Sequence, residues 1–158
     1  MYGPLILLYS VPIWNSTYTY LSILNGLYAH VFGLDRMVHM LLINHMAIMV
    51  SFHASYMIDK NVFENFKKFY KYFWIGNFVN HIAPVMYYGW YIHTHNIRPM
   101  SPYIGIVTLM YHLLWRYRVS DSFLMDKIYV KARPEVWYFG WMVAAFVHLT
   151  FPWVLHLA

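Results

Sequence analysis

Long apolar runs separated by short polar or basic segments dominate the pattern of this chain. Runs that are candidates for membrane-spanning helices cover residues 18–33, 37–57, 70–93, 101–117 and 136–156. A helix needs roughly 20 residues to cross the hydrocarbon core, so the first and fourth runs are marginal in length. Residues 4–14 are too short to span, and we expect them to lie along the membrane interface. The pattern predicts an all-α, polytopic membrane bundle of about five segments that forms one domain, residues 1–158.

The composition supports a membrane location. Of the 158 residues, 61% are hydrophobic, 22% are aromatic and only 11% are charged, whereas a soluble domain has about 25% charged residues. A core of this size cannot bury so much apolar surface, so most of it must face lipid or partner proteins. The chain has no cysteine, which excludes disulfides, thiolate metal sites and a cysteine nucleophile.

Basic residues gather in the loops at residues 58–69 and 118–135 and directly beside them. With five spans these two loops lie on the same side of the membrane, and the positive-inside rule places that side in the cytoplasm or the mitochondrial matrix. We expect an integral protein of the mitochondrial inner membrane with both loops in the matrix. The basic residues are Lys60, Lys67, Lys68 and Lys71 around the first loop and Arg116, Arg118, Lys127, Lys131 and Arg133 around the second.

Basic residues beside tryptophans predict a binding site for anionic lipid headgroups, and cardiolipin is the expected phospholipid. The alternative is a solvated loop that only fixes the topology. The candidate lipid-binding residues are Arg98, Trp115, Arg116, Arg118, Lys131, Arg133 and Trp137.

Histidines inside the predicted spans need an explanation, because polar side chains in a membrane are costly and usually face the bundle interior. His45, His81, His112 and His148 lie within the runs. The first interpretation is hydrogen bonding between helices, with Ser51, Thr108, Thr150 and tyrosine hydroxyls as further partners. Pro84 supports it, because this proline frees a carbonyl near Asn80 that another group must satisfy.

A second interpretation is haem ligation. His39 and His53 are 14 residues apart, and so are His81 and His95. Because the second and third runs should be antiparallel, His39 would lie near His95 and His53 near His81, giving two bis-histidine sites about 21 Å apart. The bulky Tyr87, Tyr88 and Trp90 would crowd the faces of such a haem b, so the sequence does not favour it. No metal site is favoured, because His93 and His95 point apart on a helix.

A third interpretation rests on a resemblance. The segments NHIAPVMYY (residues 80–88), LMYHLLW (109–115) and WYFGWMVAAFVHLTFPW (137–153) resemble the last helices of the YwaF-like family of multi-pass membrane proteins. Eukaryotic members of that family are phospholipid acyltransferases. The resemblance covers about half the chain and implies that His81, His112 and His148 correspond to intramembrane histidines of the family. The cysteine on which the eukaryotic members rely is absent, which puts an acyl-enzyme route in doubt.

These features lead to one expected function and two alternatives. We expect a non-enzymatic accessory subunit of a larger energy-transducing complex, a respiratory-chain or ATP synthase assembly, that packs against partner helices and anionic lipid. Membrane lipids and other integral membrane subunits are the expected partners, and nucleic acid is not. The alternatives are a histidine-dependent intramembrane lipid acyltransferase or hydrolase, in which a histidine acts directly as a base, and a bis-histidine haem electron carrier.

Overall fold

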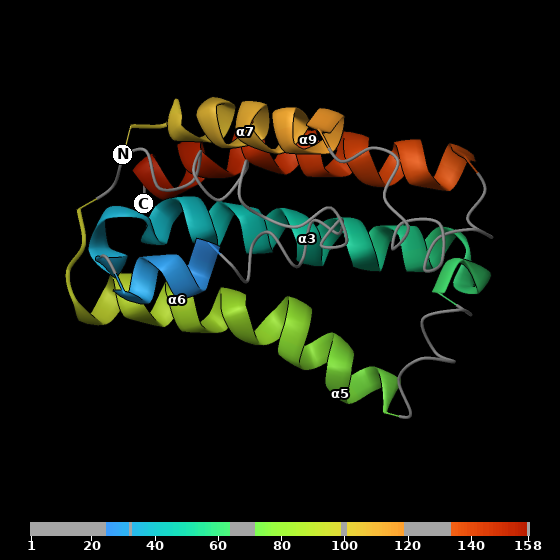
Figure 1. Cartoon of the computed structure of the whole chain (residues 1–158), viewed down its shortest axis with the longest axis horizontal. Helices are drawn as coiled ribbons and strands as arrows, with labels where there is room; N and C mark the ends of the chain where they lie inside the picture. The colour runs from blue at the N-terminus through green and yellow to red at the C-terminus, as the bar shows by residue number, and fades with distance from the viewer. Residues whose placement is uncertain (1–24, 32, 64–71, 99–100, 119–133, 158) are drawn as a thin grey trace.

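A computed structural model describes residues 25–31, 33–63, 72–98, 101–118 and 134–157 (Figure 1). Every regular element in these ranges is a helix, which confirms the all-α class. The predicted interfacial stretch at residues 4–14 lies outside the described residues.

Two of the predicted spans form helices that are long and apolar enough to cross a membrane. They are α3, Val38–Ile58, and the Tyr138–Leu157 part of α9, Pro134–Leu157. They correspond to the predicted runs 37–57 and 136–156. Pro152 lies inside α9, and membrane helices tolerate proline where neighbours satisfy the freed backbone group. The membrane-helix character of the chain therefore rests on these two elements.

The other predicted spans form shorter pieces. The run 70–93 contains α5, Phe73–Asn77, then the π-helix η3, Phe78–Ile82, then α6, Ala83–Thr94. The run 101–117 forms α7, Ile104–Arg118, whose apolar part is only Ile104–Leu114. Of the run 18–33, the described part is helical over residues 25–31. Short 3-10 turns, η1 at Leu34–Arg36 and η2 at Lys60–Phe63, flank α3. The five-span arrangement stays a prediction.

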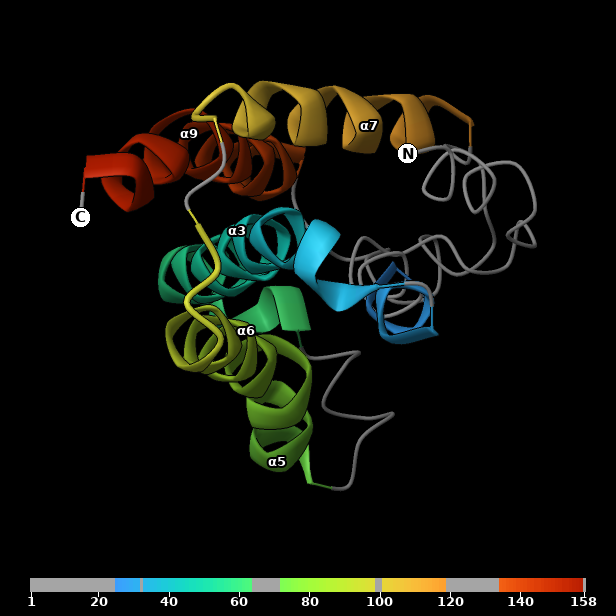
Figure 2. The ribbon, with the colours of Figure 1, turned by 90° about the vertical axis from the view of Figure 1, so that its left-hand side faces the viewer.

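The central element is α3. In the end-on view, α9 and α7 lie on one side of α3 and α6 lies on the other (Figure 2). The Tyr91 hydroxyl of α6 donates a 2.6 Å hydrogen bond to Asp35, just before α3 begins. At the opposite end Asn77 contacts His53, near the end of α3. The second and third predicted runs are therefore antiparallel, as the sequence predicts.

The placement of the two basic loops on one side of a membrane stays a prediction. In Figure 1, α3 ends and α9 begins at the right-hand end of the molecule. Most of the second loop, residues 119–133, lies outside the described residues.

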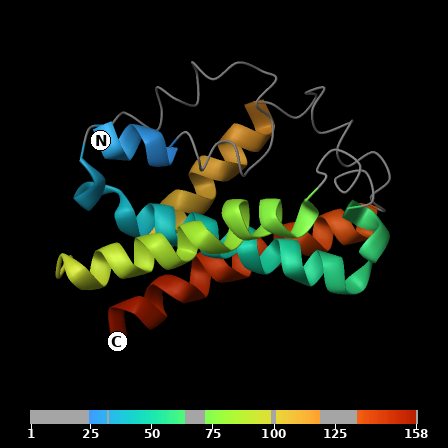
Figure 3. The ribbon, with the colours of Figure 1, turned by 90° about the horizontal axis from the view of Figure 1, so that it is seen from below.

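A close approach fixes α7 against α9. Seen from below, α7 is inclined to the other long helices (Figure 3). Gly105 lies where they meet, because an added Cβ would collide with the backbone oxygen of His148 and lie 2.7 Å from the Pro152 side chain. Small residues allow membrane helices to approach in this way.

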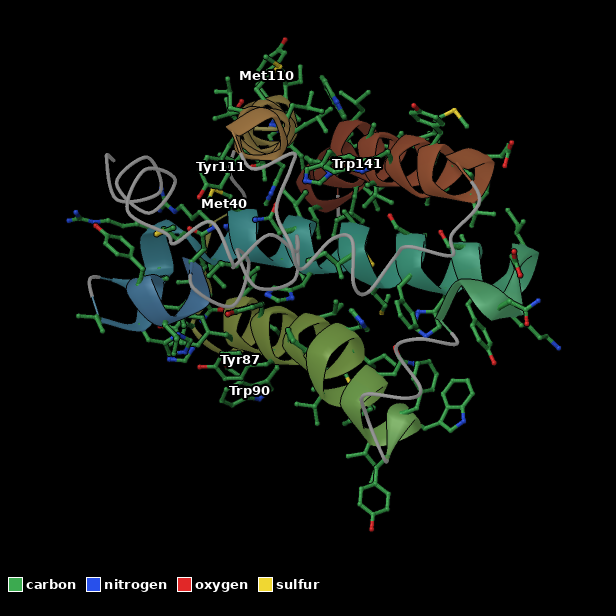
Figure 4. All side chains as sticks on the ribbon, turned by 45° about the vertical axis from the view of Figure 1, so that its right-hand side comes forward. Met40, Tyr87, Trp90, Met110, Tyr111 and Trp141 are labelled. Atoms are coloured by element: carbon green, nitrogen blue, oxygen red, sulfur yellow. The ribbon has the colours of Figure 1, made fainter. Side chains whose placement is uncertain are left out.

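The interior of the bundle contains polar side chains among its apolar core, and much of its outside is apolar. Buried polar residues include Asn25, Asn44, Asn77 and Thr108, and the histidines His39, His45, His81, His112 and His148 are also buried. Large apolar side chains such as Met110, Met142 and Phe146 are exposed. In Figure 4, Met110 points away from the bundle while its neighbour Tyr111 points inward, and Tyr87 and Trp90 project from the side of α6 away from α3. This distribution suits a chain whose surroundings are lipid or other membrane proteins.

Candidate functional site: two polar clusters on α3

The first group of polar side chains, the α9-side cluster, consists of Asn44 of α3, His112 of α7 and His148 of α9. His112 Nε2 donates to Asn44 Oδ1 at 2.7 Å, and His148 Nε2 lies 3.3 Å from the same oxygen. His148 Nδ1 donates to the carbonyl of Ala144 at 2.8 Å. The two imidazole rings meet edge to face with centroids 5.8 Å apart. One asparagine therefore joins three helices in a cluster of fully buried side chains.

The second group, the α6-side cluster, consists of His53 of α3, Asn77 of α5 and His81 of η3. His53 Nδ1 donates to the Met49 carbonyl at 2.7 Å, and Asn77 Nδ2 donates to His53 Nε2 at 3.3 Å. The His81 ring stacks on Phe52 with centroids 4.3 Å apart and an interplanar angle of 24°. Within the described residues, neither ring nitrogen of His81 has a hydrogen-bond partner. The same is true of Asn77 Oδ1.

Proline explains why His81 lies in a π-helix. Pro84 has no N–H, and its ring clashes with the carbonyl of residue 80, four positions earlier. The backbone responds by widening over Phe78–Ile82, directly before the proline. Such π-turns inside α-helices occur frequently at functional sites. The turn presents His81 to α3, where the side chain is only 4% exposed.

His45 lies between the two clusters. Its ring is 5.5 Å from that of Tyr88 on α6, and its side chain is buried.

The prediction of hydrogen bonds between helices is confirmed in part. His112 donates to Asn44 of another helix, and the hydroxyls of Tyr91 and Tyr111 reach Asp35 and Asn25. His148 donates to a carbonyl of its own helix and only approaches Asn44. For His81 the prediction is wrong within the described residues, because its contact with α3 is ring stacking. It is also wrong for the hydroxyls of Ser51, Thr108 and Thr150, which donate to carbonyls four residues earlier in their own helices, a local bond that serine and threonine readily form.

One predicted pair of haem ligands lies in a single cluster, and the two members of the other pair differ in burial. His53 and His81 lie in the same cluster, as expected from the antiparallel helices. His39 is buried, whereas His95 is exposed and stacks on Tyr91 at 3.9 Å. Haem ligation by these residues stays a prediction. Within the described ranges, no three histidine, aspartate or glutamate side chains converge as metal ligands.

No catalytic residue is favoured by the sequence, and the three histidines that the acyltransferase alternative would use divide between the two clusters. His112 and His148 belong to the α9-side cluster, and His81 belongs to the α6-side cluster. Ser51 and Thr108 carry hydroxyls that would have to replace the absent cysteine as nucleophile, and both donate their protons within their own helices. An acyl-enzyme mechanism needs a nucleophile beside a base, and the described contacts do not supply that pair.

Most of the predicted lipid-binding side chains cannot be placed. Arg98 is exposed just after α6. The backbones of residues 115, 116 and 118 end α7, and residue 137 lies in the first turn of α9, but their side chains lie outside the described part. Lys131 and Arg133 lie outside it entirely.

Sequence reasoning missed Asn25, Asn77 and Phe52. A signal for Asn77 was present, because it lies four residues before His81 and therefore on the same helical face. Asn25 and Phe52 carry no local signal, since their roles come from the packing of distant helices.

Comparisons with protein-family models, curated proteins and solved structures return no match to this chain. The resemblance to the YwaF-like family therefore stays an expectation from the sequence.

Proposed function

We propose that this chain is a non-enzymatic accessory subunit of a larger membrane complex, in which its outer apolar faces pack against partner helices and anionic lipid. The complex we propose is an energy-transducing assembly of the mitochondrial inner membrane, either respiratory chain or ATP synthase. The proposal rests on the difference in burial between the two membrane-length helices, α3 and α9.

The observation that carries the proposal is the open face of α9. Half of the spanning window of α3 is buried within the chain, but only 22% of the window of α9 is. The exposed side chains of α9 recur every three or four residues and form one stripe along the helix. We call this the α9 stripe: Tyr138, Met142, Phe146, Leu149 and Trp153.

The chemistry of the α9 stripe suits a protein partner together with lipid. Aromatic residues and methionine are enriched in the buried centres of protein interfaces. Methionine also adapts its shape to a partner. The proposed mitochondrial location rests on the two basic loops, whose side of the membrane the positive-inside rule assigns to the cytoplasm or the mitochondrial matrix.

The test is separation of mild-detergent membranes on a native gel, with this chain followed by mass spectrometry. The proposal predicts co-migration with a large complex. A paired Phe146→Ala and Leu149→Ala variant should release the chain, because it removes the centre of the α9 stripe. The matched control, Met110→Ala with Leu113→Ala, alters exposed residues of α7 and should leave co-migration intact. Migration of the unaltered chain alone, at the size of a monomer or dimer, would contradict the proposal.

A second candidate, histidine-dependent lipid acyl transfer or hydrolysis, is favoured by one observation. His112 and His148 share Asn44, and such a pair could hold and pass a proton as a general base requires. Both rings are fully buried, so a lipid would reach them only if α7 moved. Purified protein that turns over phospholipid, with turnover abolished by His112→Ala in a folded variant, would establish this function instead.

A further inference from the structure

We propose that the α6-side cluster binds a hydroxyl group, carried by a membrane-dissolved alcohol or by water. His81 donates a hydrogen bond to the hydroxyl oxygen, and the hydroxyl proton is donated to Asn77 Oδ1. This binding site is independent of the accessory-subunit function proposed above.

The orientation of Asn77 follows from His53. A neutral imidazole has one N–H and one acceptor nitrogen. Because His53 Nδ1 donates to the Met49 carbonyl, Nε2 must accept, and only the amide nitrogen of Asn77 can donate to it. The amide oxygen of Asn77 therefore points elsewhere and needs a donor. Asn77 is 3% exposed, so bulk water does not supply that donor.

His81 supplies the complementary group. Stacking on Phe52 holds its ring in place, and its neutral form offers one donor and one acceptor, neither of which is used within the described residues. Buried polar groups almost always have a hydrogen-bond partner, and leaving one without a partner is destabilising. An occupant that satisfies these groups is therefore strongly favoured over an apolar one.

The two residues are placed to share one ligand atom. Positions four apart on a helix have Cβ atoms roughly 6 Å apart on the same face, and both side chains contact adjacent residues of α3, Phe52 and His53. A single oxygen atom at about 2.8 Å from each partner spans such a gap.

The chemistry of the cluster selects a neutral hydroxyl. A carboxylate or phosphate would be repelled by Asn77 Oδ1, and burying its charge without a cationic partner would be costly. A cation would face the N–H of His81, with no carboxylate in the cluster to neutralise it. The outer surface of α5 and η3 is apolar, with Trp74, Ile75, Phe78 and Val79 exposed, so the approach to the cluster suits a lipid-soluble molecule.

The test uses the full chain in phosphatidylcholine nanodiscs and two photoreactive probes. One probe is a diacylglycerol with a free hydroxyl, and the other is its methyl ether. If a lipid alcohol is the ligand, the hydroxyl probe should label residues 73–94 on the order of tenfold more than the ether, the ratio that about 1.4 kcal/mol supplies. His81→Phe and Asn77→Leu should each abolish this preference. His30→Phe, which alters an exposed histidine, should retain it.

A second measurement identifies water as the source. In solid-state NMR of histidine-labelled protein, magnetisation passes from water to nearby ring nitrogens. Equal labelling by the two probes with rapid transfer to His81 would assign the hydroxyl to a bound water. Equal labelling without transfer to His81, while the exposed His95 shows transfer, would overturn the proposal. Both measurements use the unaltered chain, so they remain decisive even if a variant fails to fold.

Discussion

The two polar clusters on α3 use the same residue types but differ in how their side chains meet. In the α9-side cluster, His112 donates to the oxygen of Asn44 and His148 of a third helix lies 3.3 Å from the same oxygen, while Asn44 Nδ2 has no hydrogen-bond partner among the described residues. In the α6-side cluster, the asparagine bonds to one histidine, and the second histidine only stacks on a phenylalanine. Histidine and asparagine side chains in apolar helices thus connect helices in the α9-side cluster. In the α6-side cluster they form a candidate ligand site.

The difference has a geometric cause. The α9-side cluster forms where three helices meet, so several polar groups converge from different directions. Among the described residues, the α6-side cluster forms between α3 and a single neighbour whose backbone is widened by Pro84. With only two helices, fewer donors and acceptors are available, and the π-turn directs His81 at an aromatic ring.

The largest loss in the free energy of unfolding should come from adding a side chain at the close contact between α7 and α9. A methyl group at Gly105 collides with the backbone beside His148, and overpacking of this kind costs about 3 kcal/mol. Gly105→Ala should therefore strongly lower the free energy of unfolding in mixed micelles. Gly89→Ala is the matched control: nothing lies near an added Cβ there, so the alanine should stabilise the helix by about 0.5–1 kcal/mol. Equal effects of the two variants would refute the close approach.

Removing the Asn44 side chain from the α9-side cluster should cause the next largest loss in the free energy of unfolding. Asn44→Leu leaves His112 without its 2.7 Å acceptor in a buried site, which should cost about 2 kcal/mol. The same unfolding measurement applies. A variant as stable as the unaltered protein would show that Asn44 does not hold these helices together.

The matching change in the α6-side cluster should have a smaller effect. His81→Phe keeps a ring that can stack on Phe52 and removes polar atoms that have no protein partner in the described ranges. We expect the free energy of unfolding to change by less than about 1 kcal/mol. A loss as large as that of Asn44→Leu would remove the contrast between the clusters.

The smallest loss in the free energy of unfolding should come from removing the contact between Tyr111 and Asn25 at the edge of the bundle. The Tyr111 hydroxyl and the Asn25 amide are 3.4 Å apart, a long bond, and hydrogen bonds between membrane helices average about 0.6 kcal/mol. Tyr111→Phe should lower the free energy of unfolding by that amount, measured in the same micelles. A loss several times larger would mean that the bond anchors residues 25–31 to α7.

Much of the fold followed from the sequence, but less of the site did. Continuous apolar runs predicted α3 and α9 to within two residues at each end, and the antiparallel pairing of α3 and α6 followed from their order. The histidines inside the apolar runs, His45, His81, His112 and His148, are buried, as the sequence predicted. The partners of each histidine could not be predicted, because whether Asn44 meets His112 or His81 depends on which face of α3 each helix covers. Pro84 indicated a break in the helix near Phe78–Ile82. The stacking of His81 on Phe52 could not be predicted, because it depends on which residue of α3 lies opposite.

The most direct test of the apolar outer face is a spin-label scan of α9. The chain has no cysteine, so single cysteine substitutions across residues 138–157 can each carry one label in a lipid bilayer. The account predicts that collisions with oxygen, which concentrates in lipid, peak at Met142, Phe146, Leu149 and Trp153 and fall at Ala144, Val147 and His148. Collisions with a water-soluble nickel complex should stay low throughout. High nickel accessibility along the α9 stripe would show that this face meets water, and would contradict the membrane assignment.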